Sequence, residues 1–309
     1  MRLTELLNTE NVTISCELFP PKQGAQLDNY KKIVGDMAAL KPAYMSVTYG
    51  ATGGTSDYTV ELANEVRNVN HIPALAHLTC ASSTKEKVAS VIQELKEKQI
   101  ENVLALRGDI PQNADFPLPN QYKHASELIY DIKSQGDFCI GGACYPEGHP
   151  ESQTLEEDLI HLKEKVDAGC EFLTTQMFFD NNILYNFMYK ALKHGIDVPV
   201  VAGIMPITNA NQVKRSIDLS GSLVPRRFLA IVDRFGSDPA AMKQAGIAYA
   251  TDQIIDLIAN GVNHVHIYTM NKPDVAGAIL ENLSDIYVRD IPSSLPCPVV
   301  LRGVLHVKI

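Results

Sequence analysis

The chain has 309 residues with 45% hydrophobic and 20% charged side chains, which suits a sizeable soluble core in two ordinary domains or one large α/β barrel. Its formal net charge of -9 argues against nucleic acid as the main partner, because phosphate backbones attract basic surfaces. The sequence shows no basic and apolar leader and no run of about 18 apolar residues, so we expect a cytoplasmic protein with no membrane span.

Short apolar runs alternate with amphipathic segments from residue 13 onward, which predicts strands alternating with helices. The expected strands are Thr13–Phe19, Tyr44–Val47, Pro73–Leu78, Val103–Leu106, Phe138–Cys144, Phe172–Thr175, Val200–Ile204 and His264–Tyr268. The expected helices are Leu27–Leu40, Asp57–Asn68, one that opens at Ser83, His124–Ser134, Thr154–Asp167, Asn181–Lys193, Asn209–Ser220, Pro225–Phe235, Asp238–Ala259 and Asp274–Leu283. Ser83 with Glu86, and Thr154 with Glu157, have the spacing of capping boxes.

Eight alternations without a composition break predict an α/β fold, a single (β/α)8 TIM barrel over residues 1–288. The helix Pro225–Phe235 is an extra one before the last strand. Residues 289–309 break the pattern, so we expect an irregular C-terminal tail there. That tail is either an arm packed on a neighbouring surface or a disordered segment.

The six cysteines form no CxxC pair and show no cysteine–histidine ligand spacing, so we predict no metal site. Four of them, Cys16, Cys80, Cys139 and Cys144, fall in or beside expected strands. Reduced thiols in the core explain this pattern better than metal binding or disulfides do.

Polar residues follow the expected strands at their carboxyl ends. Arg107-Gly108-Asp109 comes directly after the apolar run Val103–Leu106, where a cation, a flexible glycine and an anion indicate a ligand site. A solvated turn with a surface ion pair is the alternative. A barrel would bring such residues to one mouth: Glu17, Thr48, His77, Arg107, Asp109, Tyr145, Gln176 and Tyr268.

Glu17 is the acid candidate among them. It lies between Cys16 and an apolar run, and such surroundings raise a carboxyl pKa toward neutrality, as a general acid requires. A strand-end carboxylate paired with a nearby cation is the alternative. His77 taken singly suits a core histidine, and Tyr145 and Tyr268 suit packing residues with a wetted hydroxyl.

Asp158, His161 and Lys165 lie on one face of the expected helix Thr154–Asp167. That face is either solvated or directed across the mouth toward a phosphate or sugar hydroxyls, with Lys165 as a point charge. GATGG at Gly50 to Gly54 is too short for a phosphate loop, and no GxGxxG follows a strand. A dinucleotide would therefore lie across loops at the top of the barrel.

Nine segments in chain order resemble the methylenetetrahydrofolate reductase family, flavin enzymes on a (β/α)8 barrel. They are SCELFPPK from Ser15, SVTYGATGG from Ser46, AHLTC from Ala76, ALRGD from Ala105, YPEGHPES from Tyr145, KVDAGC from Lys165, TTQMFFD from Thr174, GIMPITN from Gly203 and HIYTMNK from His266. The resemblance implies noncovalent FAD, reduced by NADH or NADPH, that passes hydride to 5,10-methylenetetrahydrofolate. The product is 5-methyltetrahydrofolate, for one-carbon metabolism and methionine synthesis, and two substrates sharing one flavin face imply ping-pong kinetics.

By the same resemblance, Glu17 corresponds to the general acid that protonates the leaving nitrogen. Asp109 corresponds to a carboxylate near both flavin and pterin, and Gln176 to an amide that contacts folate and nicotinamide in turn. The implied FAD-binding residues are Thr48, Tyr49, His77, Arg107, Gly108, Asp109, Ala125, Tyr145, His149, Asp158, His161 and Lys165. The implied substrate-binding residues are Asp109, Gln176, Gln212, Tyr268 and Lys272. The chain departs from the pattern of bacterial members at His124, His161, Glu164, Ser216 and Lys272.

Two other hypotheses stay open. In one, a carrier such as ferredoxin replaces NAD(P)H as the electron donor, beside a partner subunit. In the other, the barrel binds folate without redox chemistry. We expect a homo-oligomer and no large C-terminal regulatory domain.

Overall fold

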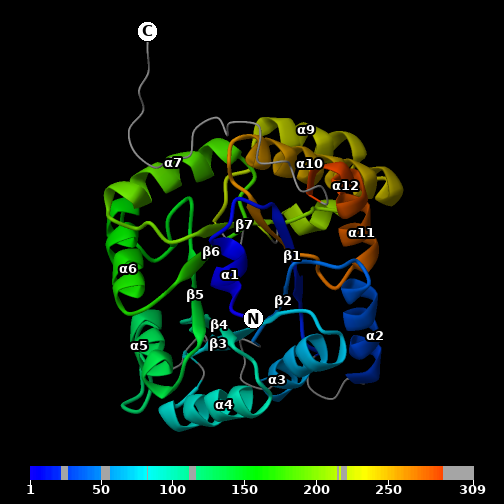
Figure 1. The fold of residues 1–309 in the computed structure, drawn as a ribbon. Coiled ribbons are helices and arrows are strands. Elements are labelled where there is room, and N and C mark those ends of the chain that lie inside the picture. Colours follow the sequence, from blue (N-terminus) through cyan, green and yellow to red (C-terminus); the bar gives the residue numbers. More distant parts are fainter. Residues whose placement is uncertain are drawn as a thin grey trace.

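A computed structural model describes residues 1–21, 27–49, 56–81, 83–110, 116–213, 216 and 221–287 of the chain. Eight parallel strands close into a barrel in chain order, so that β1 pairs with both β2 and β8 (Figure 1). They are β1 Thr13–Leu18, β2 Met45–Val47, β3 Ala74–Thr79, β4 Asn102–Leu106, β5 Cys139–Cys144, β6 Phe172–Thr175, β7 Val200–Ile204 and β8 His264–Ile267. The expected (β/α)8 barrel is confirmed, and β6 and β7 have the predicted bounds.

Helices surround the barrel as a ring, except for the short helix α1 Leu3–Leu7 (Figure 1). The others are α2 Leu27–Ala38, α3 Ser56–Asn64 with the π-helical turn η1 Glu65–Val69, α4 Lys85–Glu97, α5 Ala125–Gln135, α6 Leu155–Asp167, α7 Asn181–Lys193, α9 Arg226–Phe235, α10 Pro239–Ala259, α11 Pro273–Asn282 and α12 Ser284–Tyr287. The extra helix expected before the last strand is α9. In the described part of the chain, no helix is long and apolar enough to cross a membrane.

Of the two predicted caps, Thr154 is confirmed, although the Glu157 carboxylate accepts the backbone N–H of Gln153 at 2.7 Å and does not complete a capping box. Thr154 caps α6, since its hydroxyl accepts the backbone N–H of Glu157 at 3.1 Å. The prediction for Ser83 is wrong, because the cap of α4 is Thr84, which accepts the N–H of Lys87 at 3.3 Å. Ser83 is buried in the turn after β3, where its N–H donates to the carbonyl of Cys80. The turn therefore delays the start of the helix by one residue.

The short helix α1 was not predicted, and it closes the amino-terminal end of the barrel. It lies at the centre of the ring in Figure 1, and Leu3 and Leu7 are buried against Leu75, Phe172 and Val201 from the strands. The backbone N–H of Leu3 donates to the side-chain oxygen of Asn102 at 2.8 Å, which ties α1 to β4. This end of the interior is thus filled with apolar side chains.

The strand register sorts the inward-facing side chains into layers. Strands of such a barrel are staggered by about one residue each, and the pairs of Cα atoms then fix which residues come level. One layer holds Ser46, Leu104, Thr174 and His266. The next, toward the carboxyl ends, holds Glu17, His77, Ala143 and Gly203. Above it lies the layer of Thr48, Leu106, Gln176 and Tyr268.

Three expectations fall wholly or partly outside the described residues. They concern the GATGG stretch, the tail at 289–309 and most of the helix Asn209–Ser220, of which residues 210–213 are helical. The five cysteines within the described part of the chain are free and buried, as expected for core thiols.

Candidate active site at the carboxyl ends of the strands

Glu17 is a buried carboxylic acid, only 5% exposed, at the end of β1. Burial raises its pKa from 4.5 to about 8, because the charged form loses its hydration. Within the described residues it has no salt-bridge partner, which would lower that pKa. Of the two interpretations of Glu17, the structure therefore favours the apolar acid over the paired carboxylate.

The floor beneath Glu17 contributes no positive charge. His266 lies with Nδ1 at 2.7 Å from the hydroxyl of Ser15 and Nε2 at 3.0 Å from that of Ser46. Burial lowers the pKa of His266 to about 3, so one nitrogen donates and the other accepts. The ring of Tyr44 stacks on the imidazole with centroids 5.7 Å apart. A neutral, packed histidine thus supports the acid.

Above Glu17, the ring of Tyr268 leans over a glycine. A Cβ on Gly203 would lie 2.6 Å from the Tyr268 hydroxyl and 2.5 Å from the carbonyl oxygen of Thr175. The Tyr268 hydroxyl donates to that same carbonyl at 2.5 Å. Burial raises the pKa of Tyr268, and the nearby carboxyl of Glu17 adds to the shift. Gly203 is therefore the residue that lets Tyr268 lie beside the acid.

Three buried polar atoms near the strand ends make no hydrogen bond within the described residues: His77 Nε2, Thr79 Oγ1 and Thr174 Oγ1. Buried polar atoms in folded proteins are normally paired, so these atoms mark positions where a ligand or water would supply the partner. Burial lowers the pKa of His77 to about 3, so its ring is neutral. Thr79 and Thr174 were not among the predicted site residues.

Positive charge collects on the side of the mouth formed by β4 and β5. The ammonium of Lys165 donates to the carbonyl of Ala143 at 2.7 Å, and burial, with the Arg107 charge adding, lowers its pKa. The Arg107 guanidinium forms two hydrogen bonds with the carboxylate of Glu151, at 2.6 and 2.5 Å, which raises the Arg107 pKa. Gly108 has φ +82°, and a Cβ there would approach Cβ of Thr79 to 3.0 Å, so the backbone turns where only glycine fits well.

Next to these cations lie Tyr145 and His149, with ring centroids 4.6 Å apart in an edge-on arrangement. Burial raises the pKa of Tyr145 to about 12, and the charges of Asp109 and Asp158 add to the shift, so both carboxylates are near its hydroxyl. Asp158 is buried and accepts a hydrogen bond from Ser152 at 3.4 Å. Burial lowers the pKa of His149, so its ring tends to stay neutral.

The face of α6 that carries Asp158, His161 and Lys165 is partly solvated and partly directed inward. Asp158 and Lys165 point into the fold, whereas His161 is exposed and stacks with His124 at the start of α5, with centroids 6.5 Å apart. Ala125 is the first residue of α5 and follows His124 directly in the chain. The middle of the face, at His161, is thus solvated, whereas Asp158 in the first turn and Lys165 in the last turn are directed inward.

The expected substrate-side residues Gln176, Gln212 and Lys272 lie in the loops after β6, β7 and β8. The side-chain oxygen of Gln176 accepts the N–H of Met177 at 2.8 Å, and its backbone N–H donates to Cys144. Gln212 accepts the N–H of Thr208 at 2.9 Å, and Lys272 donates to the hydroxyl of Thr208 at 3.1 Å. The loops after β7 and β8 are therefore joined through Thr208.

The structure places most of the sequence-predicted residues at the carboxyl end of the barrel, whereas His161 faces away from it against His124. Glu17, Asp109 and Gln176 all lie at the carboxyl ends of strands, as does Thr48, whose N–H donates to the carbonyl of Leu18. Tyr49 instead packs with the main hydrophobic core. In the described residues no cluster of three or more histidine, cysteine or acidic side chains could hold a metal ion.

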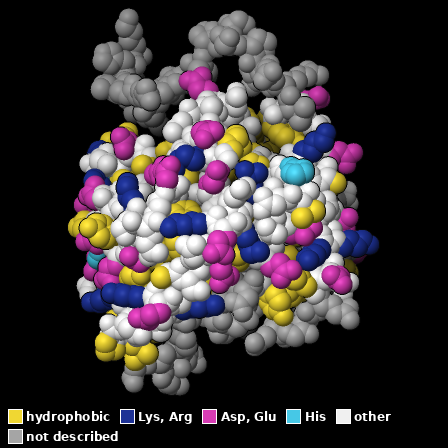
Figure 2. All heavy atoms as spheres, turned by 60° about the horizontal axis from the view of Figure 1, so that its bottom comes forward, with side chains coloured by type: hydrophobic (Ala, Val, Ile, Leu, Met, Phe, Trp, Pro, Cys, Tyr) yellow, Lys and Arg dark blue, Asp and Glu magenta, His cyan; other side chains and the backbone are white. Residues whose placement is uncertain are grey.

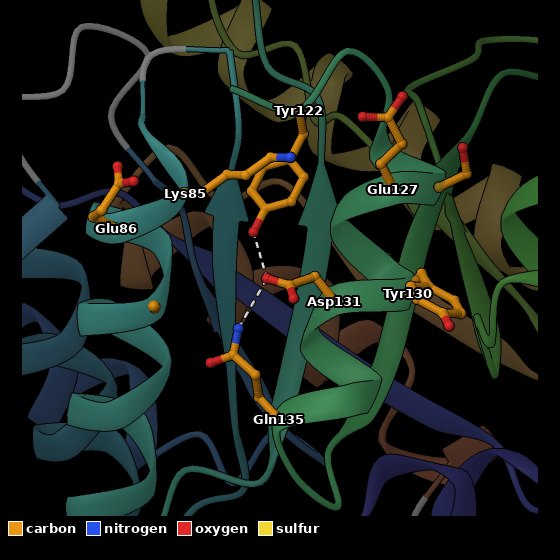
Figure 3. Close-up of a pocket in the computed structure, with 9 residues that line it drawn as sticks. Lys85, Glu86, Tyr122, Glu127, Tyr130, Asp131 and Gln135 are labelled. Atoms are coloured by element: carbon orange, nitrogen blue, oxygen red, sulfur yellow. Dashed lines mark hydrogen bonds between the residues drawn. The ribbon is translucent and has the colours of Figure 1, made fainter. Parts of the chain in front are cut away.

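An open groove of about 770 Å³ lies elsewhere, between α4 and α5 (Figure 3). Its wall holds the ammonium of Lys85, 5.2 Å from the ring centre of Tyr122, and Asp131, which accepts from Tyr122 and from Gln135. None of the predicted site residues lines it. On the face seen in Figure 2, basic and acidic side chains are interspersed.

Comparison with known proteins gives a consistent result. Residues 2–284 match the family model described as methylenetetrahydrofolate reductase. The chain is 34% identical over 272 residues to the 5,10-methylenetetrahydrofolate reductase of Pectobacterium carotovorum subsp. carotovorum, covering 88% of this chain and 90% of that protein. It is 34% identical over 308 residues to the methylenetetrahydrofolate reductase (NADH) 1 of Zea mays, covering 96% of this chain and 52% of that protein. The chain thus spans about half of the plant relative's length.

Among solved structures, a similar fold occurs in an uncharacterized protein from Clostridium thermocellum that binds two copies of 5-methyl-5,6,7,8-tetrahydrofolic acid. The TM-score is 0.63 at 14% sequence identity, with 94% of this chain and 100% of that chain covered. At this identity the likeness concerns the fold alone.

Proposed function

The chain belongs to the methylenetetrahydrofolate reductase family, and from this membership we propose that it uses FAD and NADH or NADPH to reduce 5,10-methylenetetrahydrofolate to 5-methyltetrahydrofolate. The product would feed methionine synthesis and one-carbon metabolism. The observation that carries the proposal is the buried acid Glu17 at the mouth of the barrel. A pKa of about 8 keeps it protonated at neutral pH, which is the state that a general acid needs.

In this proposal Glu17 delivers its proton to the folate nitrogen that leaves the bridging carbon. An amine is a poor leaving group until it is protonated. A positioned acid therefore lowers the activation energy for breaking the bond between the bridging carbon and that nitrogen. The neutral His266 below favours this role, because a protonated imidazole there would stabilise the carboxylate and weaken the acid.

The residues of the mouth fit FAD. Arg107 and Lys165 offer two cations for its phosphates, Gly108 leaves the backbone uncovered, and His77 holds a buried nitrogen atom that needs a partner. When bound, FAD would supply a carrier that accepts hydride from the nicotinamide and returns it to the folate. Tyr145, His149 and Asp158 border the same cations, so their aromatic and acidic groups would orient the nucleotide.

Asp109 and Gln176 are proposed to position the two substrates. Gln176 already uses its side-chain oxygen on Met177, and its amide NH2 group makes no hydrogen bond within the described residues. That group suits the carbonyl oxygens of a pterin or a nicotinamide. Asp109 is exposed beside Tyr145, where a carboxylate can accept the N–H groups of a pterin. Sharing these residues between two substrates requires that one leave before the other binds, which supports ping-pong kinetics.

The test is an absorption spectrum of the purified protein under anaerobic conditions. We expect a flavin band that NADH or NADPH bleaches and that methylenetetrahydrofolate then restores. A flavin band that neither nucleotide bleaches would instead favour a protein electron donor such as ferredoxin. A colourless protein that takes up no added FAD would favour a folate-binding barrel without redox chemistry.

We also propose that the protein works in the cytoplasm as a homo-oligomer. The free cysteines of the described core suit a reducing compartment. Light scattering of the purified protein would give the oligomeric state, and a monomer at micromolar concentration would contradict the second part.

A further inference from the structure

Arg107 is already occupied by an anion from its own chain. Its two terminal nitrogen atoms donate to the two carboxylate oxygens of Glu151, at 2.6 and 2.5 Å, which is the bidentate arrangement that guanidinium groups also form with phosphates. The Arg107 side chain is 22% exposed, and that of Glu151 is 58% exposed. A phosphate that binds to this guanidinium edge must therefore displace Glu151.

The two partners differ in how firmly they are held. The backbone carbonyl of Arg107 accepts N–H groups from Cys80 at 3.2 Å and Ala81 at 2.7 Å, which fixes it at the end of β4. Glu151 lies in the turn between β5 and α6, where its own N–H donates to Nδ1 of His149 at 3.1 Å. The arginine is thus the fixed partner, and the glutamate belongs to a surface turn that also orients His149.

We propose that Glu151 is a latch on Arg107: its carboxylate fills the guanidinium edge until a phosphate of the flavin nucleotide replaces it. This inference rests on the proposed use of FAD. Because one bidentate edge holds one anion at a time, binding exchanges the carboxylate for the phosphate and releases the turn that carries His149. Glu151 then opposes tight binding and speeds flavin release. Lys165 keeps its bond to the carbonyl of Ala143 and stays in place.

The same turn supplies a matched control. Glu147 accepts the N–H of Leu223 at 2.8 Å and makes no described contact with Arg107. Glu147→Gln therefore removes one carboxylate from the same segment between β5 and α6, and it retains an oxygen atom that can accept the N–H of Leu223. A latch predicts different results for the two substitutions, whereas a general effect of surface charge predicts similar ones.

The experiment follows FAD release from diluted holoenzyme by the rise in free flavin fluorescence. We expect Glu151→Gln to slow release and to lower the dissociation constant for FAD about fivefold, as for loss of a half-exposed ion pair. Glu147→Gln should stay within about twofold of the wild type. Unchanged or faster release from Glu151→Gln would overturn the latch, because it would mean that Glu151 holds Arg107 in a useful position.

A double-mutant cycle separates the latch from direct repulsion of the ligand. In an Arg107→Met background we expect weaker FAD binding and no further effect of Glu151→Gln on release. An equal slowing in that background would overturn the latch in favour of direct repulsion. A wild-type chain that takes up no FAD would contradict the proposed cofactor and the latch together, whereas FAD uptake with unaltered release in Glu151→Gln would contradict the latch alone.

Discussion

The two ends of the barrel interior differ in the polarity of the side chains that fill them. At the amino-terminal end, α1 and the strands bury Leu3, Leu7, Leu75, Phe172 and Val201 in one apolar cluster. At the carboxyl end, the interior holds the acid Glu17, together with a nitrogen atom of a neutral histidine and two threonine hydroxyls that lack partners among the residues that the structure describes. The amino-terminal cluster has one such atom within the described residues, the buried hydroxyl of Tyr44, and is otherwise apolar.

Apolar packing at the amino-terminal end stabilises the fold, whereas the buried polar atoms at the carboxyl end destabilise it. Buried polar atoms without partners cost about 1–3 kcal/mol each, so the carboxyl end is held in place by the packing beneath it. In barrels of this kind, chemistry lies at the carboxyl ends of the strands and stability at the opposite end. The predictions below test whether this division holds, residue by residue.

Glu17→Gln gives the largest expected effect. Because glutamine cannot donate an acidic proton, folate turnover should fall by about 10²–10⁴-fold. Reduction of the flavin by NADH or NADPH should be nearly unchanged, since that half-reaction needs no proton at the folate nitrogen. Stopped-flow measurement of the two half-reactions separates these outcomes.

The matched control is the same substitution at the other end. Glu171 forms an ion pair with Arg2 at 2.8 Å near the amino-terminal end of the barrel. Glu171→Gln should leave both half-reactions unchanged. Equal loss of both half-reactions in Glu17→Gln would contradict an acid role restricted to folate.

Phe172→Ala should have the converse effect. Phe172 is fully buried and fills the space over Gly141, where an added Cβ would come within 2.4 Å of its ring. Its loss should lower the free energy of unfolding by about 3–5 kcal/mol, as large-to-small core substitutions do. The half-reactions of the protein that remains folded should change little, and urea unfolding with parallel kinetics would show it. A selective loss of folate turnover would break the division between the two ends.

The acid at the carboxyl end should also make stability depend on pH. Its pKa is raised from 4.5 to about 8 in the folded state, so its stabilising contribution is full below 4.5 and is lost as pH rises to about 8. The wild type should therefore lose about 1.4 kcal/mol per pH unit relative to Glu17→Gln across that window. Chemical unfolding of both proteins at several pH values measures the difference, and parallel stability curves would refute the raised pKa.

Much of the fold could be predicted because each strand is a short apolar run bounded by polar or turn residues. The predicted bounds of β6 and β7 are confirmed. The predicted cap Thr154 is confirmed as well. Helix α1 could not be found this way, since five residues carry little periodicity and only the packing of Leu3 and Leu7 makes them helical. The spacing from Ser83 to Glu86 predicts Ser83 as the cap of α4, but the turn after β3 makes Thr84 the cap.

The sequence identifies the site residues that lie at the ends of apolar strands. It does not identify those whose position depends on the strand register or on pairing with a distant loop. Glu17, Arg107 and Gln176 end their strands, so the barrel alone brings them together. Thr174 looks like an ordinary strand residue, and only the register turns it inward beneath Gln176. The pairing of Glu151 with Arg107 joins two loops that no local pattern connects.

The smallest expected effects concern the two threonine caps, and they sharpen the comparison because both helices start at the carboxyl end. Thr84→Ala and Thr154→Ala should each lower the free energy of unfolding by about 1 kcal/mol. They should differ in FAD affinity, since α6 carries Asp158 in its first turn and α4 carries no proposed ligand. We expect about a twofold weaker affinity for Thr154→Ala alone, in keeping with partial fraying of that turn. Fluorescence titration with FAD measures the difference. An equal loss of FAD affinity in both variants would mean that the helix starts at the carboxyl end respond together, so that structural and ligand-binding residues there cannot be separated.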